Sequence, residues 1–282
     1  MANPINWPER SGWRNPARYC PLLDLDRSGW AWEFLRRNAD YQRAVQGLPK
    51  PKQERWLMPP LSLLSAAGVA PDWGCPFAAS ADEDALTAPP FWLPSADPSV
   101  LPVAAIPPQH MEDALDVMDL GQMVTVFRDR SGAEHVQIGP APRPIRLYVE
   151  TGTVLRGPVA LHASLCSCAV QSRLRTLRRL LDLERLGRPR TQDDVPDARG
   201  VRLAFVLQVL DGYDAGASQR EIAIALFGRE RVRTDWNGYS DYLRSRICRA
   251  IRLGQSLCDG GYRNLLRGLP FRVTAANDNE PP

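Results

Sequence analysis

Residues 218–253, SQREIAIALF GRERVRTDWN GYSDYLRSRI CRAIRL, carry the clearest secondary-structure signals in this chain. Ser218 stands three positions before Glu221, the capping-box spacing in which each side chain bonds the backbone N–H of the other residue. Gly228 suits a left-handed C-terminal cap. Three apolar residues share one face between these points: Ile222, Ala223 and Leu226. The pattern predicts a short helix that begins after Ser218 and ends before Gly228.

A second helix is predicted over residues 240–253, with Ser240 as its N-cap. Its apolar positions repeat at i, i+4, i+7 and i+8: Leu243, Ile247, Ala250 and Ile251. At about 100° per residue, Ser245, Arg249 and Arg252 point away from this stripe. Arg244 and Arg246 lie on its two shoulders. Two helices, of which the second exposes a basic face, are typical of a helix-turn-helix whose second helix enters the major groove of DNA.

An insert over residues 229–239 separates the two helices, which is more than the usual three or four residues of such a turn. It is expected to hold a further short helix packed by Val232 and Trp236, followed by a turn at Asn237. Its arginines would face the DNA backbone, while Arg244 and Ser245 are the best candidates for base edges. The candidate DNA-binding residues are Arg229, Arg231, Arg233, Asn237, Tyr239, Ser240, Arg244, Ser245, Arg246, Arg249 and Arg252.

The charge distribution supports an anionic partner for this part of the chain. Residues 218–267 contain ten arginines and five acidic residues, whereas the whole chain has a net charge of only +3. Basic character is therefore concentrated near the C-terminus, as in nucleic-acid-binding domains. The alternative is that the arginines only solvate the surface of a helical domain, the usual meaning of a charged helix face.

Several runs resemble known families. GASQREIAIALFG at 216–228, WNGYSDYLRSR at 236–246 and GGYRNLL at 260–266 resemble a proteobacterial domain of unknown function, with a match over roughly 100–267. That family occurs in regulators of integrative and conjugative elements, among them FseA-type activators and QseM-type antiactivators. WRNPARY at 13–19 and LDRSGWAWEFLRRN at 25–38 are similar to the transcriptional regulator-like domain that often precedes it. The two halves together resemble the full-length activator form.

The resemblance implies a DNA-binding transcriptional regulator on a mobile element, with double-stranded DNA as its partner. Another transcriptional regulator or a small antiactivator is a second candidate partner. The alternative hypothesis is a protein-interaction regulator that captures another transcription factor through the same domain without binding DNA. A homodimer would double the contacts by using two half-sites, although no leucine heptad assigns one.

Enzymatic signals are weak, and we expect no catalytic residues and no cofactor. The three histidines stand in no nucleophile or metal-ligand pattern, and phosphate-loop and nucleophile-elbow motifs are missing. A tyrosine recombinase would need a reactive tyrosine, for which Tyr262 is the nearest candidate. His162, Cys166 and Cys168 provide too few ligands for structural zinc, so we expect buried thiols there and no metal.

Composition predicts a cytoplasmic protein with reduced cysteines, without a membrane span or signal peptide. The expected fold class is α+β, with a small antiparallel sheet before a helical C-terminal part. The expected divisions are an N-terminal regulator-like domain at 1–48, a proline-rich connector at 49–98, a C-terminal domain at 99–268 and a disordered tail at 269–282. Within the C-terminal domain, the sheet is expected at 100–150 and the helix-turn-helix-like part at 171–268.

Local patterns add further expectations. Residues 123–128 and 135–138 predict a hairpin, and residues 145–149 a third strand. His135 is expected at the surface, and a short helix is expected through Leu161 and Leu165. A following amphipathic helix should bury Leu174, Leu177 and Leu181. The apolar segment at 201–210 is expected to support the helix pair. In the connector, the aromatic residues favour an ordered strap anchored at 89–94.

Overall fold

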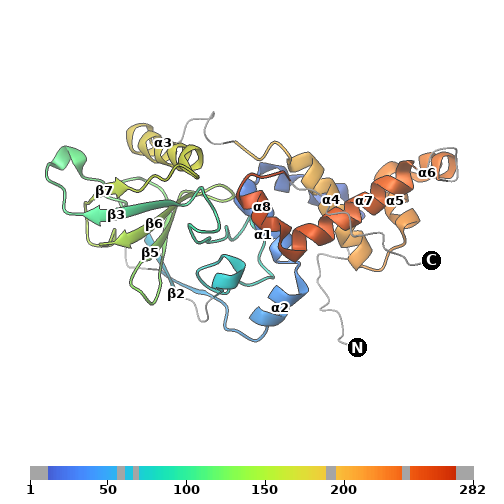
Figure 1. The fold of residues 1–282 in the computed structure, drawn as a ribbon, viewed down its shortest axis with the longest axis horizontal. Coiled ribbons are helices and arrows are strands. Elements are labelled where there is room, and N and C mark those ends of the chain that lie inside the picture. The colour runs from blue at the N-terminus through green and yellow to red at the C-terminus, as the bar shows by residue number, and fades with distance from the viewer. Residues whose placement is uncertain (1–11, 56–60, 66–69, 189–194, 237–241, 271–282) are drawn as a thin grey trace.

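The computed structural model describes residues 12–55, 61–65, 70–188, 195–236 and 242–270. Figure 1 shows a β-sheet at one end of the molecule and a group of helices at the other, so the fold is α+β as expected. The helices are α1 (Arg27–Leu35), α2 (Ala39–Val45), α3 (Val170–Leu186), α4 (Gly200–Asp214), α5 (Gln219–Phe227), α6 (Arg229–Asp235), α7 (Tyr242–Ser256) and α8 (Tyr262–Leu266). The strands are β1 (Lys52–Arg55), β2 (Leu61–Ser65), β3 (Leu101–Ile106), β4 (Val124–Arg128), β5 (Glu134–Ile138), β6 (Ile145–Thr151) and β7 (Ala160–Ala163).

The strands of the described residues form one sheet in the order β1-β2-β4-β5-β6-β3-β7. Antiparallel pairing of β4 with β5 and of β5 with β6 confirms the predicted hairpin and third strand. The sheet is nevertheless larger than expected and mixed, because β2 pairs parallel with β4 and β3 pairs parallel with β6. Parallel neighbours are joined by long crossovers instead of tight turns, so local sequence carries no signal for these pairs.

The segment after Pro158 is a strand and not the short helix that we expected. β7 pairs antiparallel with β3, and Ala163 lies opposite Val103. Without this pairing, the outer edge of β3 would present unpaired backbone N–H and C=O groups. Pairing with β3 therefore determines the conformation of this segment, although Leu161 and Leu165 have helical spacing.

α3 covers one face of the sheet (Figure 1). It buries Leu180 and Leu183 in the apolar core of the sheet, with Leu177 partly buried beside them. Leu181 is 39 % exposed, so the buried stripe is displaced from the one that we expected. Packing against the sheet gives α3 the role of an amphipathic core helix that its sequence predicted.

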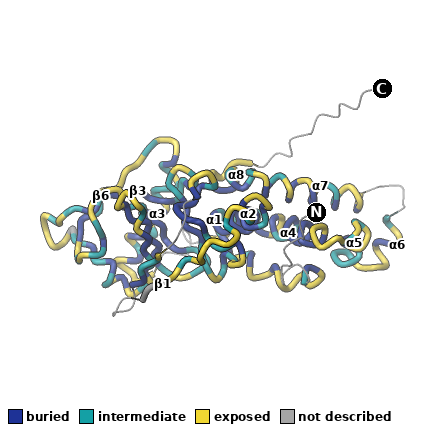
Figure 2. Tube along the Cα trace, turned by 90° about the horizontal axis from the view of Figure 1, so that it is seen from below, coloured by how far each residue is buried: buried dark blue, intermediate teal, exposed yellow. Residues whose placement is uncertain are grey.

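One apolar core unites the N-terminal helices with the C-terminal ones. α4 buries Leu203, Leu207 and Leu210 near its centre, which confirms the predicted supporting helix. The tryptophans Trp13 and Trp30 are at most 1 % exposed in the same core. Figure 2 shows the buried residues extending through α1 and α4. The N-terminal tryptophans at positions 13, 30 and 32 are thus core residues.

The proline-rich connector is partly ordered as a strap, as its aromatic residues indicated. Trp92 is 2 % exposed and stacks on Tyr262, with ring centroids 6.1 Å apart. Nε2 of Gln137 in β5 donates hydrogen bonds to the carbonyl oxygens of Pro89 and Pro90 at 3.1 and 2.9 Å. The strap therefore connects the sheet with the helical core. Unexpectedly, the connector also contributes β1 and β2 to the sheet.

Two expectations about the exposure of polar side chains are wrong: His135 was expected at the surface, and Cys166 and Cys168 were expected to be buried. His135 is only 2 % exposed, because every residue of β5 is buried between β4 and β6 and their covering segments. The thiols of Cys166 and Cys168 are partly or fully exposed, and their Sγ atoms lie 3.1 Å apart just before α3. In the described segments, no cluster of three or more histidine, cysteine or acidic side chains is placed to hold a metal.

Two further expectations concern membrane-spanning helices and the C-terminal tail. No helix among the described residues is long and apolar enough to cross a bilayer. Apart from Leu269 and Pro270, the expected tail lies outside the described residues.

Candidate nucleic-acid interface

α5 begins with the predicted capping box. Oγ of Ser218 accepts a hydrogen bond from the backbone N–H of Glu221 at 3.3 Å, and the Glu221 carboxylate accepts one from the backbone N–H of Ser218 at 2.8 Å. These bonds stabilise the ionised carboxylate and lower the pKa of Glu221. Ile222 and Ala223 are fully buried. The small Ala223 side chain lets α5 approach the neighbouring helices closely.

Gly228 joins α5 directly to α6. Its φ of 87° is one that glycine adopts readily, but its ψ of 151° is extended and not left-handed helical. The expected left-handed cap is therefore absent at this residue. Gly228 instead ends α5 and is also the N-cap residue of α6, so one residue separates the two helices.

α6 confirms the short helix predicted within the insert. Val232 is buried, and Trp236 packs partly buried against the helical core. The candidate arginines of α6 differ in their surroundings. Arg231 pairs with Asp235 at 3.6 Å and Arg233 pairs with Glu230 at 3.1 Å, whereas the exposed Arg229 has no such partner among the described residues.

α7 is the longer helix of the candidate interface and crosses α4. Its predicted stripe is buried: Leu243, Ile247, Ala250 and Ile251. Gly254 continues the stripe, and a Cβ atom there would lie 3.2 Å from Cβ of Leu210 in α4. The missing side chain at Gly254 therefore lets α7 approach α4 closely, which fixes the orientation of its outer face.

The outer face of α7 carries four candidate residues that are all exposed: Arg244, Ser245, Arg249 and Arg252. Arg249 donates a hydrogen bond from Nε to the carbonyl oxygen of Ser245 at 3.2 Å. Within the described segments, no acidic side chain pairs with Arg244 or Arg252. These cations are solvated at the surface and remain available to an anionic partner.

Arg246 occupies a different place from the other arginines of α7. Its guanidinium lies over the rings of Phe205 and Phe227, 4.7 and 5.2 Å from their centroids. Phe205 belongs to α4 and Phe227 to α5, so this cation–π contact joins three helices. Sequence reasoning missed this phenylalanine pair, because the two residues meet only through tertiary packing.

Three candidate residues, Asn237, Tyr239 and Ser240, lie outside the described residues. The structure therefore places eight of the candidates, on α6 and α7, at the end of the molecule away from the sheet (Figure 1).

Tyr262 does not have the position that a recombinase nucleophile would need. Its side chain is fully buried, and its hydroxyl donates a hydrogen bond to the carbonyl oxygen of Trp73 at 3.0 Å. Burial raises the pKa of Tyr262, which disfavours the phenolate. Tyr262, the first residue of α8, is therefore part of the apolar core of the helices.

Two family models match this chain and support its assignment as a transcription regulator with a DNA-binding domain. Residues 161–267 match a family model described as the DNA-binding domain of a T6SS transcription factor of the RovC type. Residues 12–78 match the proteobacterial transcriptional regulator-like domain. The order of the two domains is the one that the sequence indicated. No curated protein matches the chain.

Proposed function

We propose that α7 is the recognition helix and enters the major groove of DNA. The observation that carries this proposal is its outer face, where exposed cations stand opposite the buried stripe. Arg244 and Ser245, near the start of the helix, would face base edges, as the first residues of a recognition helix do. Arg249 and Arg252, one and two turns farther along, would contact phosphates.

α6 supplies a second contact in this proposal. Arg229 is exposed at the start of α6, while Arg231 and Arg233 form ion pairs with neighbouring acidic side chains. Exposed pairs of this kind contribute little to stability, so a DNA phosphate can replace the acidic partner at small cost. α6 would therefore position the domain on the backbone without selecting a sequence.

Replacing Arg244 and Arg249 together by alanine tests the proposal. The probe is a random-sequence DNA duplex, with its dissociation constant measured by fluorescence anisotropy over a range of salt concentrations. The slope of log K against log salt should fall by about 0.9 for each phosphate that the variant no longer neutralises. Arg130→Ala, at an exposed position in the β4–β5 turn, is the matched control. A double variant that binds like this control would exclude α7 as the DNA-binding helix.

Sequence recognition needs a second measurement. Duplexes selected from a random library by the parent protein supply the specific probe. Arg244→Ala should reduce discrimination against a changed base pair by about 1–3 kcal/mol at the contacted position. If the parent selects no sequence and shows no salt-dependent binding, while co-purifying with another transcription factor, the protein-interaction hypothesis would replace this one.

We also propose that the chain activates transcription from a mobile element, as one protomer or as a homodimer on two half-sites. Support comes from the joint presence of both domains and from the resemblance of sequence runs in both halves to full-length activators of such elements. The proposal assigns no catalytic step to the chain. A reporter fused to a selected operator should increase its output with the parent and not with the Arg244→Ala, Arg249→Ala variant. A decrease in output would identify a repressor.

A further inference from the structure

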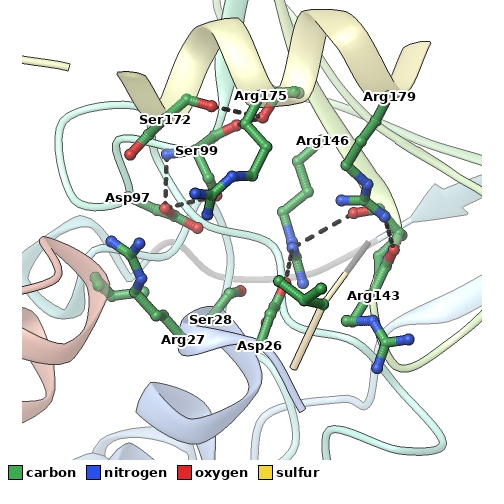
Figure 3. Close-up of a pocket in the computed structure, with 14 residues that line it drawn as sticks. Asp26, Arg27, Ser28, Asp97, Ser99, Arg143, Arg146, Ser172, Arg175 and Arg179 are labelled. Atoms are coloured by element: carbon green, nitrogen blue, oxygen red, sulfur yellow. Dashed lines mark hydrogen bonds and ion pairs between the residues drawn. The ribbon is translucent and has the colours of Figure 1, made fainter. Parts of the chain in front are cut away.

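A small polar cavity lies where the sheet, α3 and the N-terminal helices meet. Its volume is about 80 Å³. Most of the lining side chains come from the start of α1, from the loop before β3, from the start of β6 and from α3, as Figure 3 shows, and Val195 and Leu266 of α8 complete the lining. Segments that are far apart in sequence thus converge on one space at the junction between the two ends of the molecule.

The cavity contains buried polar atoms that have no partner among the described residues. Arg146 has a side chain only 5 % exposed, and its Nη1 donates to Oδ2 of Asp26 at 2.9 Å. Its Nη2 atom is buried and unpartnered, as are Oδ2 of Asp97 and Oγ of Ser28. A buried polar group gains free energy from a hydrogen bond, so these three atoms around one cavity favour the binding of a polar group there.

The positive charge of the cavity exceeds its negative charge. Arg27 from α1 and Arg175 from α3 reach toward the same space that Arg146 faces (Figure 3). Arg143 and Arg179 complete a set of five arginines, against two aspartates. Guanidinium groups hold oxyanions through paired N–H donors, and their geometry suits phosphate as well as carboxylate.

The two aspartates do not cancel this charge. Asp26 is paired with Arg146 and also caps α1, where its Oδ1 accepts a hydrogen bond from the backbone N–H of Gly29 at 2.8 Å. Oδ1 of Asp97 is held by the backbone N–H and the hydroxyl of Ser99 at 2.8 and 2.7 Å. Burial raises the pKa of Asp97, although Arg146 and Ser99 lower it. A protonated Oδ2 would donate a hydrogen bond to an oxyanion.

The volume of the cavity limits the size of the ligand that it can hold. Its 80 Å³ is far below the roughly 300 Å³ at which pockets for drug-sized ligands begin. A single tetrahedral oxyanion suits it better than a whole nucleotide. A second hollow of about 540 Å³ shares Asp26, Arg27 and Arg175 with it, so an organic group attached to the anion would have room to extend. A phosphate monoester, with about −1.5 to −2 charge near neutral pH, complements several arginines better than a carboxylate does.

DNA is the less suitable source of this phosphate. A backbone phosphate is a diester with one negative charge and a sugar on each side, which favours an open surface over a small cavity. The candidate DNA-binding arginines also lie on other elements, α6 and α7, at the helical end of the molecule (Figure 1). The cavity and the DNA interface are therefore separate features.

We propose that this cavity binds a phosphate group, supplied by a small phosphorylated molecule or by free phosphate. The phosphate would bridge Arg146 of β6, Arg175 of α3 and Arg27 of α1. It would thereby tie the sheet and α3 to the helical core. This inference stands whether or not α7 recognises DNA.

Isothermal titration calorimetry of the full chain tests the proposal, with inorganic phosphate and glycerol 3-phosphate as the two probes. Both should bind, and both should raise the melting temperature at constant ionic strength. Binding of the ester at least tenfold tighter than phosphate would identify a phosphorylated molecule as the ligand. Equal affinities would identify phosphate itself.

Arg175→Ala and Arg27→Gln should each weaken binding about tenfold, since each removes one charge-assisted hydrogen bond. Arg178→Ala is the matched control, because Arg178 is exposed on the same helix but does not line the cavity. Circular dichroism would verify that each variant is folded. Absence of binding at millimolar phosphate would overturn the proposal. Equally weakened binding in the Arg178 variant, an equal effect of acetate or chloride, or displacement of phosphate by duplex DNA would each do the same.

Discussion

Arg37, in the turn that follows α1, and Asp211 of α4 form a two-bond ion pair across 174 positions of sequence, with Nε to Oδ1 at 2.7 Å and Nη2 to Oδ2 at 3.1 Å. The Tyr19 hydroxyl donates to the same carboxylate at 2.8 Å, and Arg37 also contacts Glu33 at 2.8 Å. Both side chains of the ion pair are at least 89 % buried. The N-terminal segment is thereby fixed to the helix that supports α5 and α7.

Asp211→Ala should lower the free energy of unfolding by about 3–5 kcal/mol, because it leaves Arg37 and the Tyr19 hydroxyl buried without their acceptor. Chemical denaturation monitored by circular dichroism measures this change. Asp235→Ala is the matched control, because its ion pair with Arg231 is largely exposed and should contribute less than about 1 kcal/mol. A similar small decrease in both variants would show that the buried pair does not hold the two segments together.

Sequence patterns predicted the elements whose signals are local. The Ser218 capping box, the buried stripe of α7 and the β4–β5 hairpin each depend on residues within a few positions of one another, and all are present. The parallel pairing of β2 with β4 was missed, because its partners are distant in sequence and no turn joins them.

The positions of side chains were likewise predictable only where they depend on residues nearby in sequence. The periodicity of α7 placed Arg249 and Arg252 correctly on its exposed face. The stacking of Arg246 on Phe205 was not predictable, since a shoulder position on a helix can face either solvent or a neighbouring helix. The cavity around Arg146 was missed for a related reason, because its walls come from segments that are far apart in sequence.

Arg246→Ala should mainly reduce stability, whereas Arg252→Ala should mainly reduce DNA binding. Removing the Arg246 guanidinium from Phe205 and Phe227 should lower the free energy of unfolding by about 1 kcal/mol. Arg252 is exposed, so its replacement should change stability by less than about 0.5 kcal/mol while weakening DNA binding. Denaturation curves and salt titrations with a random-sequence duplex measure the two effects. Equal stability of the two variants would contradict the structural role of Arg246.

His135 should make the fold sensitive to mild acid. Burial lowers the pKa of His135 below its ordinary value of 6.5, although its contact with Asp129 raises it. The unfolded chain therefore binds a proton more readily than the folded chain. The stabilising effect of the neutral imidazole is complete above about pH 6.5 and is lost as the pH falls through the lower folded-state pKa.

The free energy of unfolding should therefore fall as the pH decreases from 7 toward about 5, before most carboxylates titrate. His135→Gln should show a flatter dependence over this range. His110→Gln, at an exposed position, should follow the parent. Parallel curves for the parent and the His135 variant would refute a contribution of His135.

Cys166 should be alkylated more readily than Cys168, Cys75 and Cys258. The hydrogen bond between the two Sγ atoms lowers the pKa of Cys166, with further lowering by the nearby Arg173, whereas the same contact raises the pKa of Cys168. Burial raises the pKa of Cys75 and brings that of Cys258 to about 12. Because the thiolate is the nucleophile, iodoacetamide at neutral pH should modify Cys166 first and the two buried thiols last, as followed by peptide mass spectrometry. Cys168→Ala should slow the reaction at Cys166 by removing its hydrogen-bond partner, and Cys20→Ala, in the N-terminal segment, should not. Faster labelling of Cys168, or an unchanged Cys166 rate in the Cys168 variant, would show that this hydrogen bond does not activate Cys166.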